Sequence, residues 1–241
     1  MKRLALPLFL VFAVQADNDP RLTVHTIVRE DIFAGYLQKD MARFEKGEKK
    51  LEELFNERPN QRHHVVVWQA SSTLYRALLA YQEGKVADGD RYYALAQERF
   101  EAASKLAPAD GGVLAVSAAS RALFADRLPA DKRQGEWSKA YDAYQKMAAQ
   151  QLPIVDKLPS HLQGELLAGL TMAAQRTGRQ EEYEKHLDKM IAVLKDSPYL
   201  PMAKTWKERP ELVAKTNLLC KNCHDDGRLE PTKARLAAAK Q

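Results

Sequence analysis

The stretch GKVADGDRYYALAQERFEAASKLAP, residues 84–108, decides the fold class of this chain. It is rich in Ala, Leu, Glu, Gln and Lys, which have high helix propensity, and it contains no β-branched run. Pro108 stands where a helix must already have ended, because proline cannot continue an α-helix. The stretch therefore predicts a helix over residues 90–106. The rest of the chain has a similar composition, so we expect an all-α protein.

Four prolines repeat this arrangement along the chain at a nearly constant interval. Pro59, Pro108, Pro153 and Pro198 are separated by 49, 45 and 45 residues, and each follows a charged amphipathic stretch. Each interval has room for two helices and two turns. A recurring helix pair is the sequence sign of a helical solenoid. We therefore predict a solenoid of helical hairpins over residues 17–198.

Residues within these units resemble the tetratricopeptide repeat. The small, aromatic and proline positions of that repeat are matched by Gly84, Ala96, Phe100, Ala103 and Pro108. The second half of the pattern nearly recurs in Gly135, Trp137, Ala140, Tyr144 and Pro153, and residues 177–183 resemble part of a third unit. These units run about ten residues beyond the usual ~34, and most first-helix signature residues are missing. The resemblance implies small residues where two helices approach closely, and aromatic residues between neighbouring pairs.

The sequence pattern predicts eight helices, with a linker after the seventh. The expected ranges are 30–56, in which residues 40–54 could be a second member of a degenerate pair, 64–83, 90–106, 112–128, 136–151, 160–177, 180–195 and 203–219. Ser160 is expected to be an N-cap with Gln163 completing a capping box. Residues 197–201 form the clearest linker. Residues 199–241 are then a short C-terminal segment whose end, residues 229–241, resembles a charged, partly ordered tail.

The first sixteen residues have the pattern of a secretory signal peptide. Lys2 and Arg3 precede an almost unbroken apolar run over residues 4–14, and Ala16 offers a small residue for cleavage. The run is too short to span a bilayer comfortably, and no cysteine at its end indicates a lipid anchor. We expect residues 1–16 to be removed and the mature chain, without a membrane span, to be periplasmic or otherwise exported.

The two cysteines of the chain stand near its end in the sequence Cys220-Lys221-Asn222-Cys223-His224. This C-x-x-C-H spacing is that of a c-type haem attachment site. Positions i, i+3 and i+4 of a helical turn share one face. Cys220 and Cys223 can therefore offer two sulfurs to the vinyl groups of one covalently attached haem c, while His224 offers a nitrogen to the iron. Export supports this prediction, because free thiols are rare in oxidising compartments. Three alternatives stay open: a Cys220–Cys223 disulfide, half of a zinc site, and two cysteines that have no special role.

The position of the motif limits how the haem would be covered. Only 17 residues follow His224, so a full haem-wrapping domain cannot form after it. The local sequence over residues 220–226 resembles that of the helical-bundle cytochromes c-prime, which carry the motif near their C-terminus. That resemblance covers only seven residues and concerns the placement of the motif. Because so little chain follows the motif, we expect the haem to lean on the solenoid or on a partner for its remaining cover.

The sixth ligand of the iron is less constrained by the sequence. Met202 is nearest to the motif and is flanked by prolines that could fix a ligand loop, so it is the candidate. The other conceivable ligands are His63, His64, His161, His186, Met172 and Met190. His63 and His64 stand together at a helix start, which is typical of a solvated pair. An open sixth position would instead permit small-molecule binding.

Charge and motifs exclude several function classes. The 37 Lys and Arg residues fall to 35 when Lys2 and Arg3 are removed, against 32 Asp and Glu residues. The charges alternate in sign along the expected helices, whereas nucleic-acid binding needs a clustered basic face. The sequence also lacks a P-loop, a dinucleotide-binding fingerprint and a serine-nucleophile motif.

Together these patterns predict an exported c-type haem protein that transfers one electron to or from a protein partner docked on the helical repeats. It is then a carrier rather than an enzyme in its own right. Two alternatives remain: a non-redox periplasmic scaffold with a Cys220–Cys223 disulfide, or a haem-bearing subunit of a larger redox enzyme. The sequence does not fix the oligomeric state.

Overall fold

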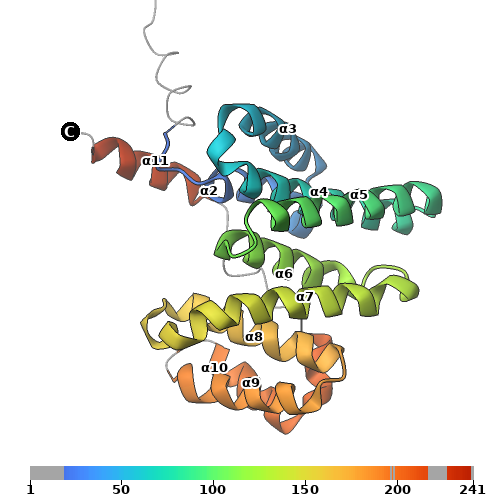
Figure 1. Ribbon diagram of the computed structural model, residues 1–241, viewed down its shortest axis with the longest axis vertical. Helices are drawn as coiled ribbons and strands as arrows, with labels where there is room; N and C mark the ends of the chain where they lie inside the picture. Colours follow the sequence, from blue (N-terminus) through green and yellow to red (C-terminus); the bar gives the residue numbers. More distant parts are fainter. Residues whose placement is uncertain (1–18, 196, 198, 217–226, 240–241) are drawn as a thin grey trace, which may run out of the picture. The chain divides into compact units, whose positions relative to one another are not determined.

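The computed structural model describes residues 19–195, 197, 199–216 and 227–239 (Figure 1). All regular structure within these residues is helical, which confirms the predicted all-α class. The α-helices are α2 (Val24–Phe33), α3 (Met41–Glu57), α4 (Arg62–Gln82), α5 (Val86–Leu106), α6 (Gly111–Ala125), α7 (Ala130–Gln151), α8 (Ser160–Arg176), α9 (Gln180–Val193), α10 (Tyr199–Glu208) and α11 (Leu229–Ala238). The predicted signal peptide, residues 1–16, lies outside the described residues.

The chain divides into two compact units. The larger unit runs over residues 59–221, and the smaller unit combines residues 1–58 with residues 222–241. The larger unit therefore holds α4 to α10, and the smaller unit holds α2, α3 and α11.

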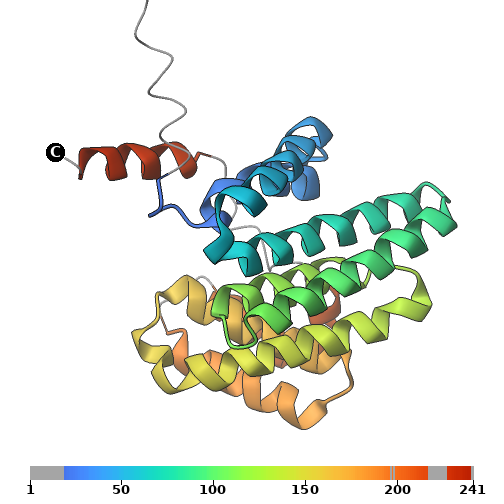
Figure 2. The same ribbon diagram turned by 45° about the horizontal axis from the view of Figure 1, so that its top comes forward.

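The larger unit is built from helices that pack in consecutive pairs. Helix α4 packs along α5, α6 along α7, and α8 along α9. Figures 1 and 2 show each pair as two rods lying side by side and joined by a short turn. Neighbouring pairs meet where α4 contacts α6 and where α7 contacts α8. In the sequence, Pro108 stands between the first and second of these pairs, and Pro153 between the second and third.

Two of the pairs turn through the same backbone device. Gly84 after α4 and Gly178 after α8 have φ angles of 75° and 71°, a left-handed conformation that glycine adopts without steric cost. The next amide donates back into the preceding helix, from Lys85 to Ala80 at 2.9 Å and from Arg179 to Ala174 at 2.9 Å. This is the Schellman pattern, which ends a helix and reverses the chain. The repeated Gly-Lys and Gly-Arg positions therefore set the two hairpins.

Aromatic side chains fill the space between neighbouring pairs. A Cβ atom on Gly169 of α8 would lie 2.3 Å from the Tyr144 ring of α7, so only glycine admits this close approach. Tyr75 of α4 stacks on Phe124 of α6, with ring centroids 5.5 Å apart. All three aromatic side chains are buried. Burial of such rings is the main favourable term in packing one pair on the next.

The C-terminal part of the larger unit differs from the predicted helix over residues 203–219. Helix α10 begins at Tyr199, and it ends at Glu208 because Pro210 cannot donate a helical hydrogen bond. A tight 3-10 segment, η4 (Pro210–Lys215), follows. Pro201 lies in the first turn of α10, where a missing N–H breaks no intrahelical bond.

The smaller unit contains a break within the expected helix over residues 30–56, which agrees with the alternative of a second helix over residues 40–54. Helix α2 ends at Phe33, and a π-helical turn over Ala34–Gln38 leads to Lys39, which has a φ of 59°. Asp40 then caps α3, because its side chain accepts a hydrogen bond from the Arg43 amide at 3.1 Å. Aspartate is a strong N-cap, so α3 starts here as a separate helix.

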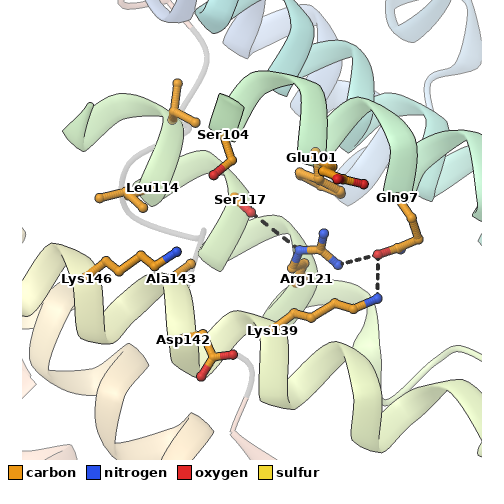
Figure 3. A pocket seen from close by; sticks show the side chains of 12 residues that line it. Gln97, Glu101, Ser104, Leu114, Ser117, Arg121, Lys139, Asp142, Ala143 and Lys146 are labelled. Carbon is orange, nitrogen blue, oxygen red and sulfur yellow. Dashed lines mark hydrogen bonds between the residues drawn. The ribbon is translucent and has the colours of Figure 1, made fainter. Parts of the chain in front are cut away.

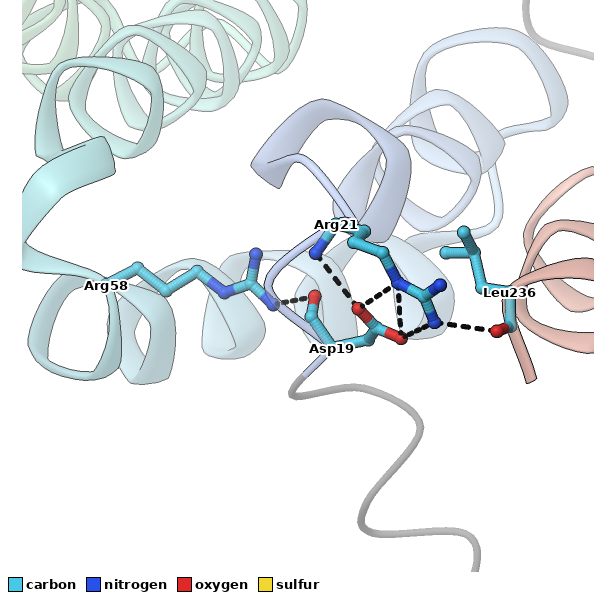
Figure 4. Close-up of polar contacts among 4 residues, drawn as sticks. All are labelled: Asp19, Arg21, Arg58 and Leu236. Carbon is cyan, nitrogen blue, oxygen red and sulfur yellow. Dashed lines mark hydrogen bonds and ion pairs between the residues drawn. The ribbon is translucent and has the colours of Figure 1, made fainter. Parts of the chain in front are cut away.

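The tail predicted over residues 229–241 contains a helix, α11, within the same unit. Glu30 of α2 accepts hydrogen bonds from the Arg228 and Leu229 amides at 2.6 and 2.7 Å, which satisfies the free amides at the start of α11. Arg21 donates to the Leu236 carbonyl at 2.6 Å, and Asp19 holds Arg21 in place at 2.7 Å (Figure 4). These contacts are polar and distant in sequence, so helix propensity alone could not reveal them.

The capping box expected at Ser160 is wrong. Pro159 is the N-cap of α8, and no side chain caps this helix. Gln163 instead donates to the carbonyls of Val155 and Leu158 at 2.8 and 2.9 Å. Its amide group therefore fixes the preceding segment, η3 (Leu152–Lys157), against the start of α8.

Candidate functional site

The predicted haem ligands fall in a part of the chain that the structure does not describe. Cys220, Cys223 and His224 lie within residues 217–226, outside the described residues. The described residues before the motif end at Thr216, and they include α10 and η4.

This leading segment, α10 with η4, is anchored on the larger unit. Trp206 is 1% exposed, and its indole nitrogen donates to the Thr216 hydroxyl at 3.1 Å. The Tyr183 hydroxyl of α9 donates to the Trp206 carbonyl at 3.0 Å. Val213 of η4 is also buried. A ring, a valine side chain and two hydrogen bonds thus hold the chain up to four residues before Cys220.

The end of α8 reinforces that anchor. Gln175 donates to the Pro210 carbonyl at 2.6 Å, and Arg176 donates to the Ala214 carbonyl at 2.7 Å. Arg176 is itself oriented by an ion pair with Asp126 at 2.6 Å and by the Trp137 ring, 5.2 Å from its guanidinium carbon. Charge-assisted bonds of this kind have more directional preference than neutral ones.

The candidate sixth ligands have different surroundings. Met202, on the first part of α10, is half-buried and therefore partly accessible. Met172 of α8 and Met190 of α9 are 3% and 0% exposed, which is typical of core residues. His161 is exposed at the start of α8. His186 is buried, and its Nε2 atom has no hydrogen-bond partner. Among the methionines considered, Met202 alone combines access with proximity in sequence to the motif.

A pocket of about 350 Å³, lined by both polar and apolar side chains, lies between α5, α6 and α7 (Figure 3). Arg121 of α6 forms one wall, and its guanidinium pairs with the fully buried Glu136 at 2.7 Å. The same group donates to Gln97 at 2.9 Å and lies 4.1 Å from the Phe100 ring centre. Lys139 also donates to Gln97, at 2.7 Å. The pocket therefore combines a fixed guanidinium with a more exposed ammonium group.

Tyr93 completes the buried polar group beside this pocket. Its hydroxyl donates to Glu136 at 2.7 Å. Burial, followed by the negative charge of Glu136, raises the pKa of Tyr93 well above its ordinary value. Tyr93 is thus a fixed hydrogen-bond donor rather than an acid–base group, and the arrangement suits structure and binding rather than proton transfer.

A third group joins the starts of two helices in the larger unit. His63 and His64 lie in the first turn of α4, and Asp110 is the N-cap of α6, where it accepts from the Val113 amide at 2.9 Å. His64 Nε2 lies 2.8 Å from Asp110 Oδ1, and His63 Nε2 lies 3.8 Å from Asp110 Oδ2. One ligand atom from each residue lies within 4.8 Å of the others. The expected solvated histidine pair is thus half-buried and faces a carboxylate.

The surroundings of this group lower the pKa of His63 and the pKa of Asp110. Burial lowers the pKa of His63, and the neighbouring His64 lowers it further. Burial tends to raise the pKa of Asp110, but the Val113 amide and His64 outweigh that effect and lower it below its ordinary value. Near neutral pH the group therefore presents an uncharged imidazole beside a carboxylate.

No protein-family model matches this sequence, and no curated protein and no solved structure is significantly similar to it. Among the described residues, none of the helices combines the length and the apolar character that crossing a bilayer requires.

Sequence reasoning did not foresee the contacts of His63, His64, Arg121 and Glu136. Each of the two groups joins residues from different helices, so no short motif contains them. One sequence signal pointed to Asp110, because it directly precedes Gly111-Gly112 at the expected start of a helix, where an N-cap stands. The carboxylate of an N-cap is held in a fixed orientation by the helix amides.

Proposed function

We propose that this chain is an exported c-type haem protein that exchanges one electron with a protein partner. The observation that carries the proposal is the Cys220-x-x-Cys223-His224 sequence, which contains the only cysteines of the chain, together with the signal-peptide pattern over residues 1–16. The donor set fits a c-type haem, because two thiols can form thioether bonds and one imidazole can bind iron. When bound, the haem supplies a one-electron iron couple.

The anchored segment before the motif supports this proposal. Cys220 lies four positions after Thr216, a distance of at most about 14 Å along a fully extended chain. Trp206, Tyr183 and Arg176 fix Thr216 and η4 in the larger unit. The role of these residues would be to tether the haem to the helical body and to restrict its orientation.

We further propose that the helix pairs of the larger unit form a tetratricopeptide-like solenoid whose surface docks the redox partner. The support is the recurrence of the same hairpin turn at Gly84 and Gly178 and the aromatic packing of Tyr144 on Gly169. In solenoids each repeat contacts its neighbours, which leaves an extended surface for partners.

The proposal is tested with the full chain produced in a host that exports proteins and attaches haem c. We expect the mature protein to start near Asp17, to carry the mass of one covalent haem, and to show a reduced-minus-oxidised visible spectrum. The Cys223→Ala variant should lose the second thioether bond and most of its haem. Wild-type protein with a plain polypeptide mass and no Soret band would contradict the proposal and favour the scaffold with a Cys220–Cys223 disulfide.

The sixth ligand has a separate test on the same material. If Met202 binds the iron, Met202→Leu should change the visible spectrum of the oxidised protein, because a thioether ligand is lost. Met172→Leu is the matched control, since Met172 is buried in the core of α8 and should leave that spectrum unchanged. Identical spectra for the wild type and Met202→Leu would remove Met202 as a ligand.

The partner proposal is tested by purification from the native source. Copurification of the haem protein with a catalytic subunit would identify it as a relay within a larger enzyme. Isolation as a free protein that reduces and oxidises reversibly would identify a carrier.

A further inference from the structure

His63, His64 and Asp110 form a group whose geometry goes beyond what helix packing requires. A capping carboxylate needs only the amides of its own helix, and Asp110 has the Val113 amide for this purpose. The same carboxylate is also approached by both imidazoles, through Oδ1 and Oδ2 separately. His63 Nε2 lies 3.8 Å from Asp110 Oδ2, which is too far for a hydrogen bond. Helix capping therefore does not explain why the His63 side chain points toward this carboxylate.

The donor types and their spacing match those of a transition-metal site. Zinc binds histidine nitrogen and carboxylate oxygen at about 2.0–2.2 Å in a roughly tetrahedral arrangement. Ligand atoms around such an ion lie about 3.3 Å apart. The three donors here lie within 4.8 Å of one another, so small rotations of the histidine side chains would bring them to that spacing. Two imidazoles and one carboxylate leave a fourth position for water.

The position is also accessible and open. The side chains of His63, His64 and Asp110 are 23%, 26% and 31% exposed, so an ion can reach them from solvent. Gly112, in the first turn of α6, provides the space between the donors. A Cβ atom at this position would lie 3.0 Å from His64 Nε2 and 3.2 Å from Asp110 Oδ1.

We propose that His63, His64 and Asp110 bind one divalent transition-metal ion, with Zn²⁺ as the best match to the donors, and that the ion joins the start of α4 to the start of α6. The three donors do not include Cys220, Cys223 or His224, so the site can be tested without the haem motif. Since α4 and α6 belong to successive helix pairs, the ion would strengthen the contact between pairs.

The experiment uses the full chain with Cys220→Ser and Cys223→Ser, so that neither thiols nor haem contribute. Calorimetric titration with Zn²⁺ should give one site per chain. Co²⁺, a spectroscopic substitute, should give a visible ligand-field band that Zn²⁺ displaces. Because the cysteines are absent, failure here would leave the haem proposal unaffected, and loss of haem elsewhere would not affect this test.

Three variants in that background identify the donors. His63→Gln should weaken Zn²⁺ binding at least tenfold, since one of three protein ligands is lost, and it should fold normally because His63 makes no hydrogen bond to Asp110. Asp110→Asn preserves the N-cap while removing the carboxylate charge, and should weaken binding similarly. His161→Gln, an exposed histidine on α8, is the matched control and should bind as the parent does.

Circular dichroism verifies that each variant remains helical, so that loss of binding reports the site. One Zn²⁺ per chain, lost in His63→Gln and Asp110→Asn but retained in His161→Gln, would support the site. No stoichiometric Zn²⁺ binding by the parent, or undiminished binding by both His63→Gln and Asp110→Asn, would overturn it.

Discussion

The Arg121–Glu136 pair shows how a single buried contact shapes the larger unit. Arg121 and Glu136 are 7% and 0% exposed at their side chains, and they join α6 to α7. Tyr93 and Gln97, both from α5, contribute to the same network. One buried ion pair thus links three helices, and water does not solvate its charges. A buried ion pair adds little net stability against apolar replacements, but a lone buried charge is costly.

We predict that Glu136→Leu alone lowers the free energy of unfolding by about 3–5 kcal/mol, because Arg121 is left as a buried charge without its carboxylate. The double variant Arg121→Met/Glu136→Leu should recover most of that loss, as two apolar groups fill the space. Urea unfolding followed by circular dichroism measures both. Glu101→Ala, which removes an exposed partner of Lys105, is the control and should leave the urea midpoint unchanged. A double variant as unstable as the single one would contradict this interpretation.

His186 introduces a pH dependence of stability. Burial lowers its pKa, and Lys185 lowers it further, whereas Glu182 acts in the opposite direction. The unfolded chain therefore binds a proton on His186 more readily than the folded chain does. The resulting loss of stability is absent above the ordinary histidine pKa of about 6.5, and it grows as the pH falls below that value.

We expect the His186→Leu variant to lose less stability than the wild type between about pH 7.5 and about pH 5.5. Urea unfolding at the two pH values gives the difference. His161→Gln removes an exposed histidine and should retain the wild-type pH dependence. If His186→Leu and wild type lose stability equally, burial of this imidazole does not control the acid sensitivity.

Among the structural elements, a hairpin turn and a helix interior can be compared through one glycine in each. Gly178 ends α8 at a positive φ, whereas Gly135 lies within α7, and a Cβ atom at either position would meet no neighbour within 4 Å. Any effect of alanine at these positions therefore arises from the backbone conformation and not from packing.

Gly178→Ala should destabilise the protein by about 1 kcal/mol, because an alanine in the left-handed region is strained. Gly135→Ala should stabilise it by about 0.5–1 kcal/mol, because alanine favours the helical backbone. The two variants are compared by thermal and urea unfolding. A Gly178→Ala variant at least as stable as the wild type would show that the turn after α8 does not need a glycine.

The helices of the repeats could be predicted well because their signals are local. The expected ranges 64–83 and 90–106 correspond to α4 (Arg62–Gln82) and α5 (Val86–Leu106), whose ends are set by glycine and proline. The early start of α5 was missed, because Val86 is 59% exposed and gives no amphipathic signal. The break before α3 was expected only as the alternative of a second helix over residues 40–54, and the docking of α11 was missed. They depend on Asp40 as a cap and on Glu30 contacting residues about 200 positions away.

The candidate sites also differ in whether their residues are close together in the sequence. The haem motif is visible in the sequence because its donors are consecutive or nearly so. The His63–His64–Asp110 group and the Arg121–Glu136 pair bring together residues 46 and 15 positions apart. Their proximity follows from how α4, α6 and α7 pack, and no sequence spacing encodes it.

At the scale of the whole molecule, we propose that the larger unit combines a docking surface for a partner with the attachment point of the haem. Its helix pairs provide the proposed docking surface, and α10 with η4 carries the chain toward Cys220. The Trp206 side chain is 1% exposed within the larger unit, and its indole nitrogen also donates a hydrogen bond to the Thr216 hydroxyl. The account therefore predicts that the proposed haem is tethered to a rigid helical support.

The most direct test of this account is the intact mass and visible spectrum of the exported protein from a host that attaches haem c. We predict one covalently bound haem per chain and a spectrum that changes reversibly on reduction and reoxidation. A colourless product with only the mass of the processed polypeptide would contradict the central claim.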